Sequence, residues 1–295
     1  KLLSLELTWS KNVLARVRNY SSFVRLNHTV FALPFALSGA LLASQSSPLT
    51  WTRLGWIVVA MVTARTAAMA FNRLVDARYD AANPRTAGRE LPRGVVSRRE
   101  AMTLVIVSSL AFVGVTFMLG FLCFVLSPFA LGLIFWYSLA KRFTSYTQIY
   151  LGLALAVAPV GGWLAADGRG GWAPWLLALG TAMWVAGFDI LYACEDFEFD
   201  RDQGLFSIPT RFGIQRSLWI SRIFHLVAVL SLATVALVMP LGPLYVAGVS
   251  GVAVLLAYEQ SLVRSDDLSR VKEAFDLNGY VGLLYLLTTA AALYV

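Results

Sequence analysis

The stretch LGWIVVAMVTARTAAMAFNRLVDARYD, residues 54–80, joins a long apolar run to a short acidic cluster. An α-helix needs about 20 apolar residues to cross a bilayer, and this run meets that requirement with one charged interruption, Arg65. Asp76 and Asp80 follow at the polar end, four residues apart, a spacing that stacks two side chains on one face of a helix. The stretch therefore predicts a membrane helix that ends in a pair of carboxylates.

A second acidic cluster, residues 189–200, also ends an apolar run and repeats this spacing. Asp196 and Asp200 lie four residues apart, and Asp189 and Tyr192 extend the same helical face. Because neighbouring carboxylates repel one another, a bound cation is the usual reason to assemble them. Oxygen ligands of this kind suit Mg²⁺, which commonly takes one or two carboxylates together with the phosphates of a substrate.

The composition of the rest of the chain is that of a multi-pass membrane protein. A mean hydropathy of +0.67, with 58% hydrophobic and only 14% charged residues, excludes an ordinary soluble domain. We therefore predict an all-α membrane protein with about nine transmembrane helices. The expected spans are residues 28–46, 54–75, 99–118, 120–140, 147–166, 172–192, 216–238, 241–262 and 274–294.

The basic residues predict the orientation of these spans. When the N-terminus and the loops after the even-numbered spans are placed on one side, that side holds 21 of the 24 Lys and Arg residues. Such an excess marks the cytoplasmic side, so we expect an inner (cytoplasmic) membrane protein whose two acidic clusters face the cytoplasm. The net charge of +7 follows from these loops and from attraction to anionic membrane lipids, and it requires no nucleic acid partner.

Polar segments divide the chain into a short leading segment and a membrane domain. Residues 1–27 are expected to lie along the membrane interface, and residues 28–295 to form the transmembrane domain. Two loops near 81–97 and 200–214 are broken by Pro and Gly and directly follow the acidic clusters, so we interpret them as lids over one site. The sequence SRRE at 97–100 has capping-box spacing and predicts that a helix resumes there.

Two charged side chains are expected inside the membrane, Arg65 and Asp189. Arg65 precedes Asn72 by seven residues, which places it about 10 Å deeper on a helix that rises 1.5 Å per residue. An isolated charge at such a depth costs several kcal/mol and is a functional candidate. Arg65 suits a planar carboxylate ligand, which a guanidinium binds through two hydrogen bonds. The alternative is a salt bridge between Arg65 and Asp189 that only ties two helices.

A third contribution comes from Tyr137 and Lys141, four residues apart at the end of another span on the same side of the membrane. Both are candidates to hold a phosphate, whereas the neighbouring Arg142 is expected to extend to lipid headgroups. Carboxylates, a metal ion and cations beside a lipid-facing groove suit a membrane lipid that carries a diphosphate. Loss of diphosphate from an allylic lipid leaves a carbocation, which a dry site protects from water.

Over nearly its whole length the chain resembles the UbiA superfamily of membrane prenyltransferases. The resemblance rests on N-R-x-x-D-x-x-x-D at 72–80, D-x-x-Y-A-x-x-D-x-x-x-D at 189–200 and GLFSIP at 204–209. The segment NPRTAGRELPRGVVS at 83–97 is most similar to the 4-hydroxybenzoate polyprenyltransferase branch. It is also similar to relatives that prenylate a dihydroxynaphthoate in an alternative menaquinone route.

The resemblance implies helices around a central cavity that the two motifs cap on the cytoplasmic side, and a role for each candidate residue. The implied ligands of a Mg²⁺ bridged to the prenyl diphosphate are Asp76, Asp80, Asp196 and Asp200. The residues expected to bind the diphosphate are Asn72, Arg25, Lys141 and Tyr137. Those expected at the aromatic acid are Arg65 and Tyr192, and those expected to act in catalysis are Asp76, Asp196 and Asp189, the last as the candidate base.

We expect a magnesium-dependent aromatic prenyltransferase that moves a polyprenyl group from an allylic polyprenyl diphosphate to the ring of 4-hydroxybenzoate in ubiquinone biosynthesis. The alternative acceptor is an aromatic hydroxy acid of the dihydroxynaphthoate type, in menaquinone biosynthesis. A CDP-alcohol phosphotransferase would require a D-G-x-x-A-R signature that the sequence lacks. An ion-coupled transporter would carry its acids near the membrane midplane, whereas these acids end helices. The length of the prenyl chain depends on packing and is left open.

Overall fold

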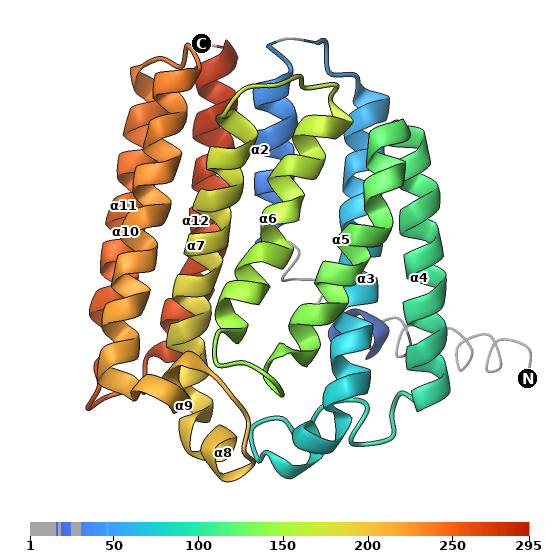
Figure 1. Cartoon of the computed structure of the whole chain (residues 1–295), viewed down its shortest axis with the longest axis vertical. Helices are drawn as coiled ribbons and strands as arrows, with labels where there is room; N and C mark the ends of the chain where they lie inside the picture. The colour runs from blue at the N-terminus through green and yellow to red at the C-terminus, as the bar shows by residue number, and fades with distance from the viewer. Residues whose placement is uncertain (1–15, 17–18, 25–30, 46, 295) are drawn as a thin grey trace, which may run out of the picture.

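The computed structural model describes residue 16 and residues 19–24, 31–45 and 47–294, and the long segments of this part of the chain are α-helices (Figure 1). Extended pairing within these residues is limited to one isolated bridge between Arg264 and Asp267. In chain order the elements are α2 (Leu33–Ala43), α3 (Trp51–Ala82), α4 (Arg98–Leu119), α5 (Phe121–Ala140), α6 (Thr147–Ala165), α7 (Ala173–Ala193), the 3₁₀ turn η2 (Cys194–Asp196), α8 (Phe197–Asp202), α9 (Ile208–Phe212), α10 (Ile214–Val238), α11 (Pro243–Leu262) and α12 (Val271–Tyr294).

Eight helices of the described chain are long and apolar enough to cross a membrane, namely α3 to α7 and α10 to α12. The shorter helix α2 has 11 residues and is also apolar. The predicted span 28–46 reaches beyond α2 at both ends, and residues 28–30 and 46 lie outside the described residues. The prediction of an all-α, multi-pass fold is confirmed, and the predicted number of helices is close to the number observed.

The two acidic clusters differ in backbone structure. Helix α3 continues to Ala82, seven residues past its predicted span, so the first motif (residues 72–80) is helical throughout. Helix α7 instead ends at Ala193, and the 3₁₀ turn η2 separates it from α8. The prediction that the second motif (residues 189–200) lies on one face of a continuous α-helix is therefore wrong. Four acids within six residues repel one another on a regular helix, which opposes its continuation.

Close helix packing holds the bundle together around α6 and α7. Helix α7 packs against α6 and α10, while α6 also packs against α2. These contacts depend on glycine, because a Cβ at Gly162 would overlap the backbone carbonyl of Ala36, and one at Gly39 would overlap that of Pro159. On the other side of α7, a hydrogen-bonded chain joins three helices: Trp184 donates to Asn278 across 2.6 Å, and Asn278 donates to Glu259 across 3.0 Å.

The connections between helices place both acidic clusters at one end of the bundle. Figure 1 shows α8, α9 and the α3–α4 loop (residues 83–97) together at its lower end, and the C-terminal end of α12 at the opposite end. Ser97 and Glu100 form the predicted capping box at the start of α4, with Glu100 accepting a hydrogen bond from the Ser97 backbone at 2.8 Å. The helix therefore resumes directly after the loop, as expected.

Candidate active site

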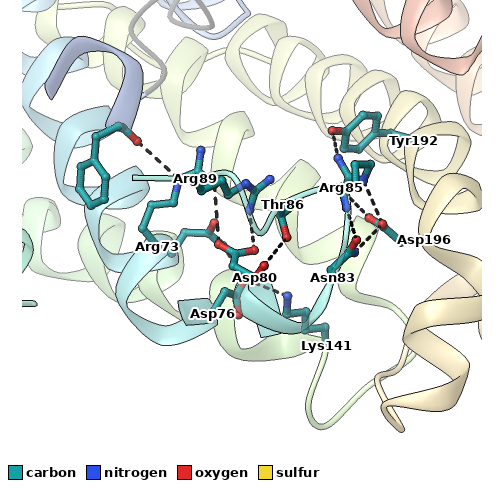
Figure 2. A network of polar contacts seen from close by, with 12 residues as sticks. Arg73, Asp76, Asp80, Asn83, Arg85, Thr86, Arg89, Lys141, Tyr192 and Asp196 are labelled. Atoms are coloured by element: carbon teal, nitrogen blue, oxygen red, sulfur yellow. Dashed lines mark hydrogen bonds and ion pairs between the residues drawn. The ribbon is translucent and has the colours of Figure 1, made fainter. Parts of the chain in front are cut away.

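The first motif carries two buried aspartates at the polar end of α3 (Figure 2). Asp76 is 4% exposed and forms ion pairs with Lys141 at 2.8 Å and Arg142 at 3.2 Å, both just after the end of α5. Asn72, one turn earlier on α3, donates to the same carboxylate across 3.3 Å. The i,i+4 relation that the sequence predicts therefore brings Asn72 and Asp76 into contact.

Asp80, the second aspartate of this motif, contacts cations from two segments. Arg89 of the α3–α4 loop approaches one carboxylate oxygen at 2.6 Å, and Arg73 of α3 lies 3.8 Å from the other. The loop folds back onto α3 because the Thr86 hydroxyl donates to the backbone carbonyl of Asp80 across 3.0 Å. Arg73 also donates to the backbone carbonyl of Phe23, which brings the described part of the N-terminal segment to the motif.

The second motif meets the α3–α4 loop through Asp196. Arg85 contacts both oxygens of this carboxylate, through Nε at 3.0 Å and through Nη2, and also donates to the hydroxyl of Tyr192. Asn83, the C-cap residue of α3, donates to Asp196 across 3.0 Å. Partial burial by itself lowers the pKa of the Arg85 guanidinium, but its bonds with Asp196 outweigh this effect and raise that pKa, so Arg85 stays charged.

The α8–α9 region is fixed to the end of α5 and the start of α6. The Phe206 backbone donates to the carbonyl of Lys141 across 2.7 Å, and the Ile208 backbone donates to the buried side chain of Gln148 across 3.1 Å. Lys141 therefore contacts the first motif through its side chain and the connection after the second motif through its backbone. These contacts bring the two motifs to one site.

An apolar cavity of about 580 Å³ lies among α2 to α7. Most of its lining is aliphatic or aromatic, but Arg65 and Tyr137 also line it. The Nε atom of Arg65 is buried and has no hydrogen-bond partner among the described residues. The ion pairs of that part of the chain do not include an Arg65–Asp189 bridge, so the purely structural role considered for Arg65 finds no support in the contacts.

The remaining predicted residues differ in their surroundings. Asp200 and Asp189 make no side-chain hydrogen bond or ion pair with the described part of the chain, and both are partly buried. The ring of Tyr192 packs against Phe275, with 4.8 Å between ring centroids. Arg25, which we expected at the diphosphate, lies outside the described residues.

The oxygen donors at this site suit a magnesium ion that is shared with a substrate. Within the described residues, no group of three or more His, Cys, Asp or Glu side chains is arranged to hold a metal ion by itself. Mg²⁺ usually takes only one or two carboxylates and completes its coordination with water and phosphate oxygens. One oxygen of Asp80 has no hydrogen bond and only the longer 3.8 Å ion pair with Arg73, and Asp200 is unpaired among the described residues, so both motifs keep acceptor capacity.

Sequence reasoning missed several residues of this site. Arg142 was expected to extend to lipid headgroups, but its guanidinium donates to the Val75 carbonyl at 2.6 Å and contacts Asp76, so that expectation is wrong. The α3–α4 loop contributes Asn83, Arg85 and Arg89, to which the sequence alone assigns no individual role at the site. Their proximity to the motifs in sequence was the only available signal, because a loop has no periodicity that indicates where its side chains point.

Comparison with known proteins agrees with this architecture. Residues 32–287 match the UbiA prenyltransferase family. The chain is 30% identical over 276 residues to the 4-hydroxybenzoate octaprenyltransferase of Vibrio campbellii, covering 92% of each chain. It is 32% identical over 243 residues to the enzyme of the same name from Aeromonas salmonicida, covering 82% of this chain and 83% of that one.

Solved structures show the same helical arrangement. A UbiA homolog from Aeropyrum pernix K1, in its apo form, superimposes with a TM-score of 0.81 at 35% identity and covers 89% of this chain and 96% of the homolog. A UbiA homolog from Archaeoglobus fulgidus bound to DMAPP and Mg²⁺ shares the fold with a TM-score of 0.68 at 18% identity, covering 94% of this chain and 99% of that one. This multi-pass membrane protein therefore belongs to the UbiA prenyltransferase family.

Proposed function

We propose that the protein transfers a polyprenyl group from an allylic polyprenyl diphosphate to the ring of 4-hydroxybenzoate, in ubiquinone biosynthesis. The observation that carries this proposal is the position of Arg65 in an apolar cavity, with its buried Nε unpartnered among the described residues, beside helices that end in two carboxylate motifs contacted by cations. The curated relatives named as 4-hydroxybenzoate octaprenyltransferases support the choice of acceptor.

The donor diphosphate binds between the two motifs. The residues that would hold Mg²⁺ are Asp76, Asp80, Asp196 and Asp200, and the bound ion supplies positive charge to the departing diphosphate. Asn72 and Lys141, which both contact Asp76, face the diphosphate, and Arg25, which lies outside the described residues, is expected to bind it as well. The isoprenoid chain lies in the apolar cavity.

The acceptor binds deeper, with its carboxylate on Arg65. The buried Nε atom of Arg65 has a proton to donate and no protein acceptor among the described residues, and a carboxylate ligand supplies that acceptor. Tyr137 lines the same cavity and precedes Lys141 by one helical turn. Its depth in the membrane therefore lies between that of the acceptor carboxylate on Arg65 and that of the diphosphate at Lys141. Tyr192 adds an aromatic face at the second motif, where Arg85 holds its hydroxyl.

The transfer itself exchanges one bond for another. The bond between prenyl C1 and the diphosphate oxygen breaks, and the electron pair leaves with the diphosphate. A ring carbon next to the phenol then bonds to C1, and its proton passes to a base, for which Asp189 is the candidate. Asp189 has no ion-pair partner in the described chain, so its carboxylate is available for a proton. The apolar lining keeps water away from the allylic cation.

The proposed orientation places this site on the cytoplasmic side of the inner membrane, on the basis of the excess of Lys and Arg in the N-terminus and loops that the sequence assigns to the side of the motifs. The α3–α4 loop and residues 200–214 then act as cytoplasmic lids. The expected interfacial position of residues 1–27 falls mostly outside the described residues, and the described Phe23 is buried and packs against the α3–α4 region.

The experiment that tests this function is an assay of the purified protein with one polyprenyl diphosphate and a panel of aromatic acids, with product masses recorded. The expected product is 4-hydroxybenzoate carrying one added prenyl group, formed only with Mg²⁺ present. Preference for a dihydroxynaphthoate would assign the protein to menaquinone synthesis instead. Absence of any prenylated product from the whole panel would overturn the proposal.

A further inference from the structure

Arg85 makes a more complete contact with a motif carboxylate than any other cation described at the site. Its guanidinium binds both oxygens of Asp196, donates to the Tyr192 hydroxyl and lies over the Tyr192 ring, 5.0 Å from the ring centroid. A bidentate arginine–carboxylate pair of this kind is strong and directional. Asn83 supplies one further hydrogen bond to Asp196. The acceptor capacity of Asp196 is therefore largely used by the protein itself.

Its loop position and exposure distinguish Arg85 from most cations of the first motif; Arg89, which pairs with Asp80, lies on the same loop but is only 20% exposed. Lys141 and Arg142 directly follow α5, and Arg73 is buried within α3. Arg85 belongs to the α3–α4 loop, and its side chain is 33% exposed. It is therefore able to leave its carboxylate through a change in loop and side-chain conformation, without displacement of a membrane helix. Figure 2 shows Arg85 between the end of α3 and the second motif.

A metal ion that binds the Asp196 oxygens competes for them with Arg85. Without a new anion nearby, the displaced guanidinium would lose a charge-assisted interaction, which opposes binding of the metal alone. A diphosphate that arrives with the metal supplies new negative charge at the same place. The cost of releasing Arg85 is then offset for the metal–diphosphate complex and not for the free ion.

We propose that Arg85 is a positioning residue of the donor site, which holds Asp196 and Tyr192 while the site is empty of donor and releases Asp196 only to magnesium that arrives with a diphosphate. This inference rests on the proposed function. It makes binding of the metal and of the diphosphate cooperative, because each ligand reduces the cost of binding the other. The second motif thus selects the loaded donor over free Mg²⁺.

The test compares the affinity for Mg²⁺ with and without inorganic pyrophosphate, measured by calorimetric titration of the purified full chain. In Arg85→Gln the positive charge next to Asp196 is lost, so the affinity for Mg²⁺ alone should rise about tenfold. This magnitude corresponds to the pKa shift of about one unit that a neighbouring opposite charge causes in a carboxylate. The further increase in Mg²⁺ affinity that pyrophosphate causes should be smaller in this variant by the same factor. Arg85→Lys keeps the charge but cannot make the paired contacts, so it should show a smaller rise and serves as the variant that is safer for folding.

The matched control is Arg93→Gln, which removes an exposed arginine from the same loop. The Arg93 side chain makes no hydrogen bond or ion pair within the described residues, so Mg²⁺ affinity should stay at the value of the unaltered protein. No rise in either Arg85 variant, or an equal rise in Arg93→Gln, would overturn the role of Arg85. Failure of pyrophosphate to strengthen Mg²⁺ binding even in the unaltered protein would instead contradict the proposed metal–diphosphate function.

Discussion

The side-chain amide of Asn83, which ends α3, donates a hydrogen bond to the carboxylate of Asp196 across 3.0 Å, although 113 residues separate the two in the chain. This contact joins the two acidic motifs without adding charge. It fixes the end of α3 against the turn that follows α7, and so determines how the carboxylates of one motif face those of the other. The site is therefore defined by tertiary contacts as much as by either motif alone.

Loss of a carboxylate from either motif is expected to reduce turnover strongly. Asp76→Ala and Asp196→Ala should each lower kcat on the order of 100-fold, the usual effect of losing a preorganised charge-stabilising group. Turnover is measured at saturating prenyl diphosphate and acceptor, with and without EDTA. Asp266→Ala, at an exposed aspartate of the α11–α12 connection, is the control and should retain activity. Full turnover in both motif variants would exclude the metal–diphosphate mechanism.

Substitution of Arg65 should separate acceptor binding from donor binding. Arg65→Lys keeps the charge but loses the paired hydrogen bonds to a carboxylate, so KM for the acceptor should rise while KM for the prenyl diphosphate changes little. Lys141→Ala should produce the opposite pattern. The double variant Arg65→Met with Asp189→Leu tests the bracing alternative, since recovery of both stability and acceptor affinity there would refute the assignment of Arg65 to the substrate.

The orientation can be tested with accessible tags. A tag in the α3–α4 loop should react only from the cytoplasm, and a tag after Tyr294 only from the opposite side, because the sequence assigns 21 of 24 basic residues to the N-terminus and loops of the predicted cytoplasmic side. Cleavage of both tags by protease in intact spheroplasts and in inverted vesicles gives the measurement. Cleavage of the C-terminal tag from the cytoplasmic side would contradict the predicted topology.

The contact between α2 and α6 predicts a difference between two adjacent glycines. Gly162→Ala should destabilise the protein on the order of 1–3 kcal/mol, because its Cβ would overlap the Ala36 carbonyl, a backbone group that cannot move aside easily. Gly161→Ala is the matched control, since a Cβ there meets no atom within 4 Å. Thermal unfolding in detergent should show a clear loss of Tm for the first variant only. Equal stability of the two would mean that α2 and α6 are further apart.

The sequence predicted most of the fold, because long apolar runs and basic loops carry direct signals of membrane helices. It also predicted that Asn72, Asp76 and Asp80 share a helix, since periodicity relates them locally. It did not predict the turn between α7 and α8 or the contacts of the Arg142 side chain. Both depend on neighbours distant in sequence: Arg142 reaches the Val75 carbonyl on another helix, which no local pattern reveals.

The cavity occupies only one part of the bundle, and this affects which amino-acid substitutions the protein tolerates. Of the residues described, those that line the cavity come from α2 to α7 and the segments beside them, and none belongs to α10, α11 or α12. Most substitutions in these last three helices reach the reactants by weakening the scaffold, as through the Trp184–Asn278 contact, and Phe275 of α12, which packs against Tyr192, is the exception. Homologous proteins should therefore diverge freely there as long as volume is preserved, and changes of substrate preference should accumulate in the earlier helices.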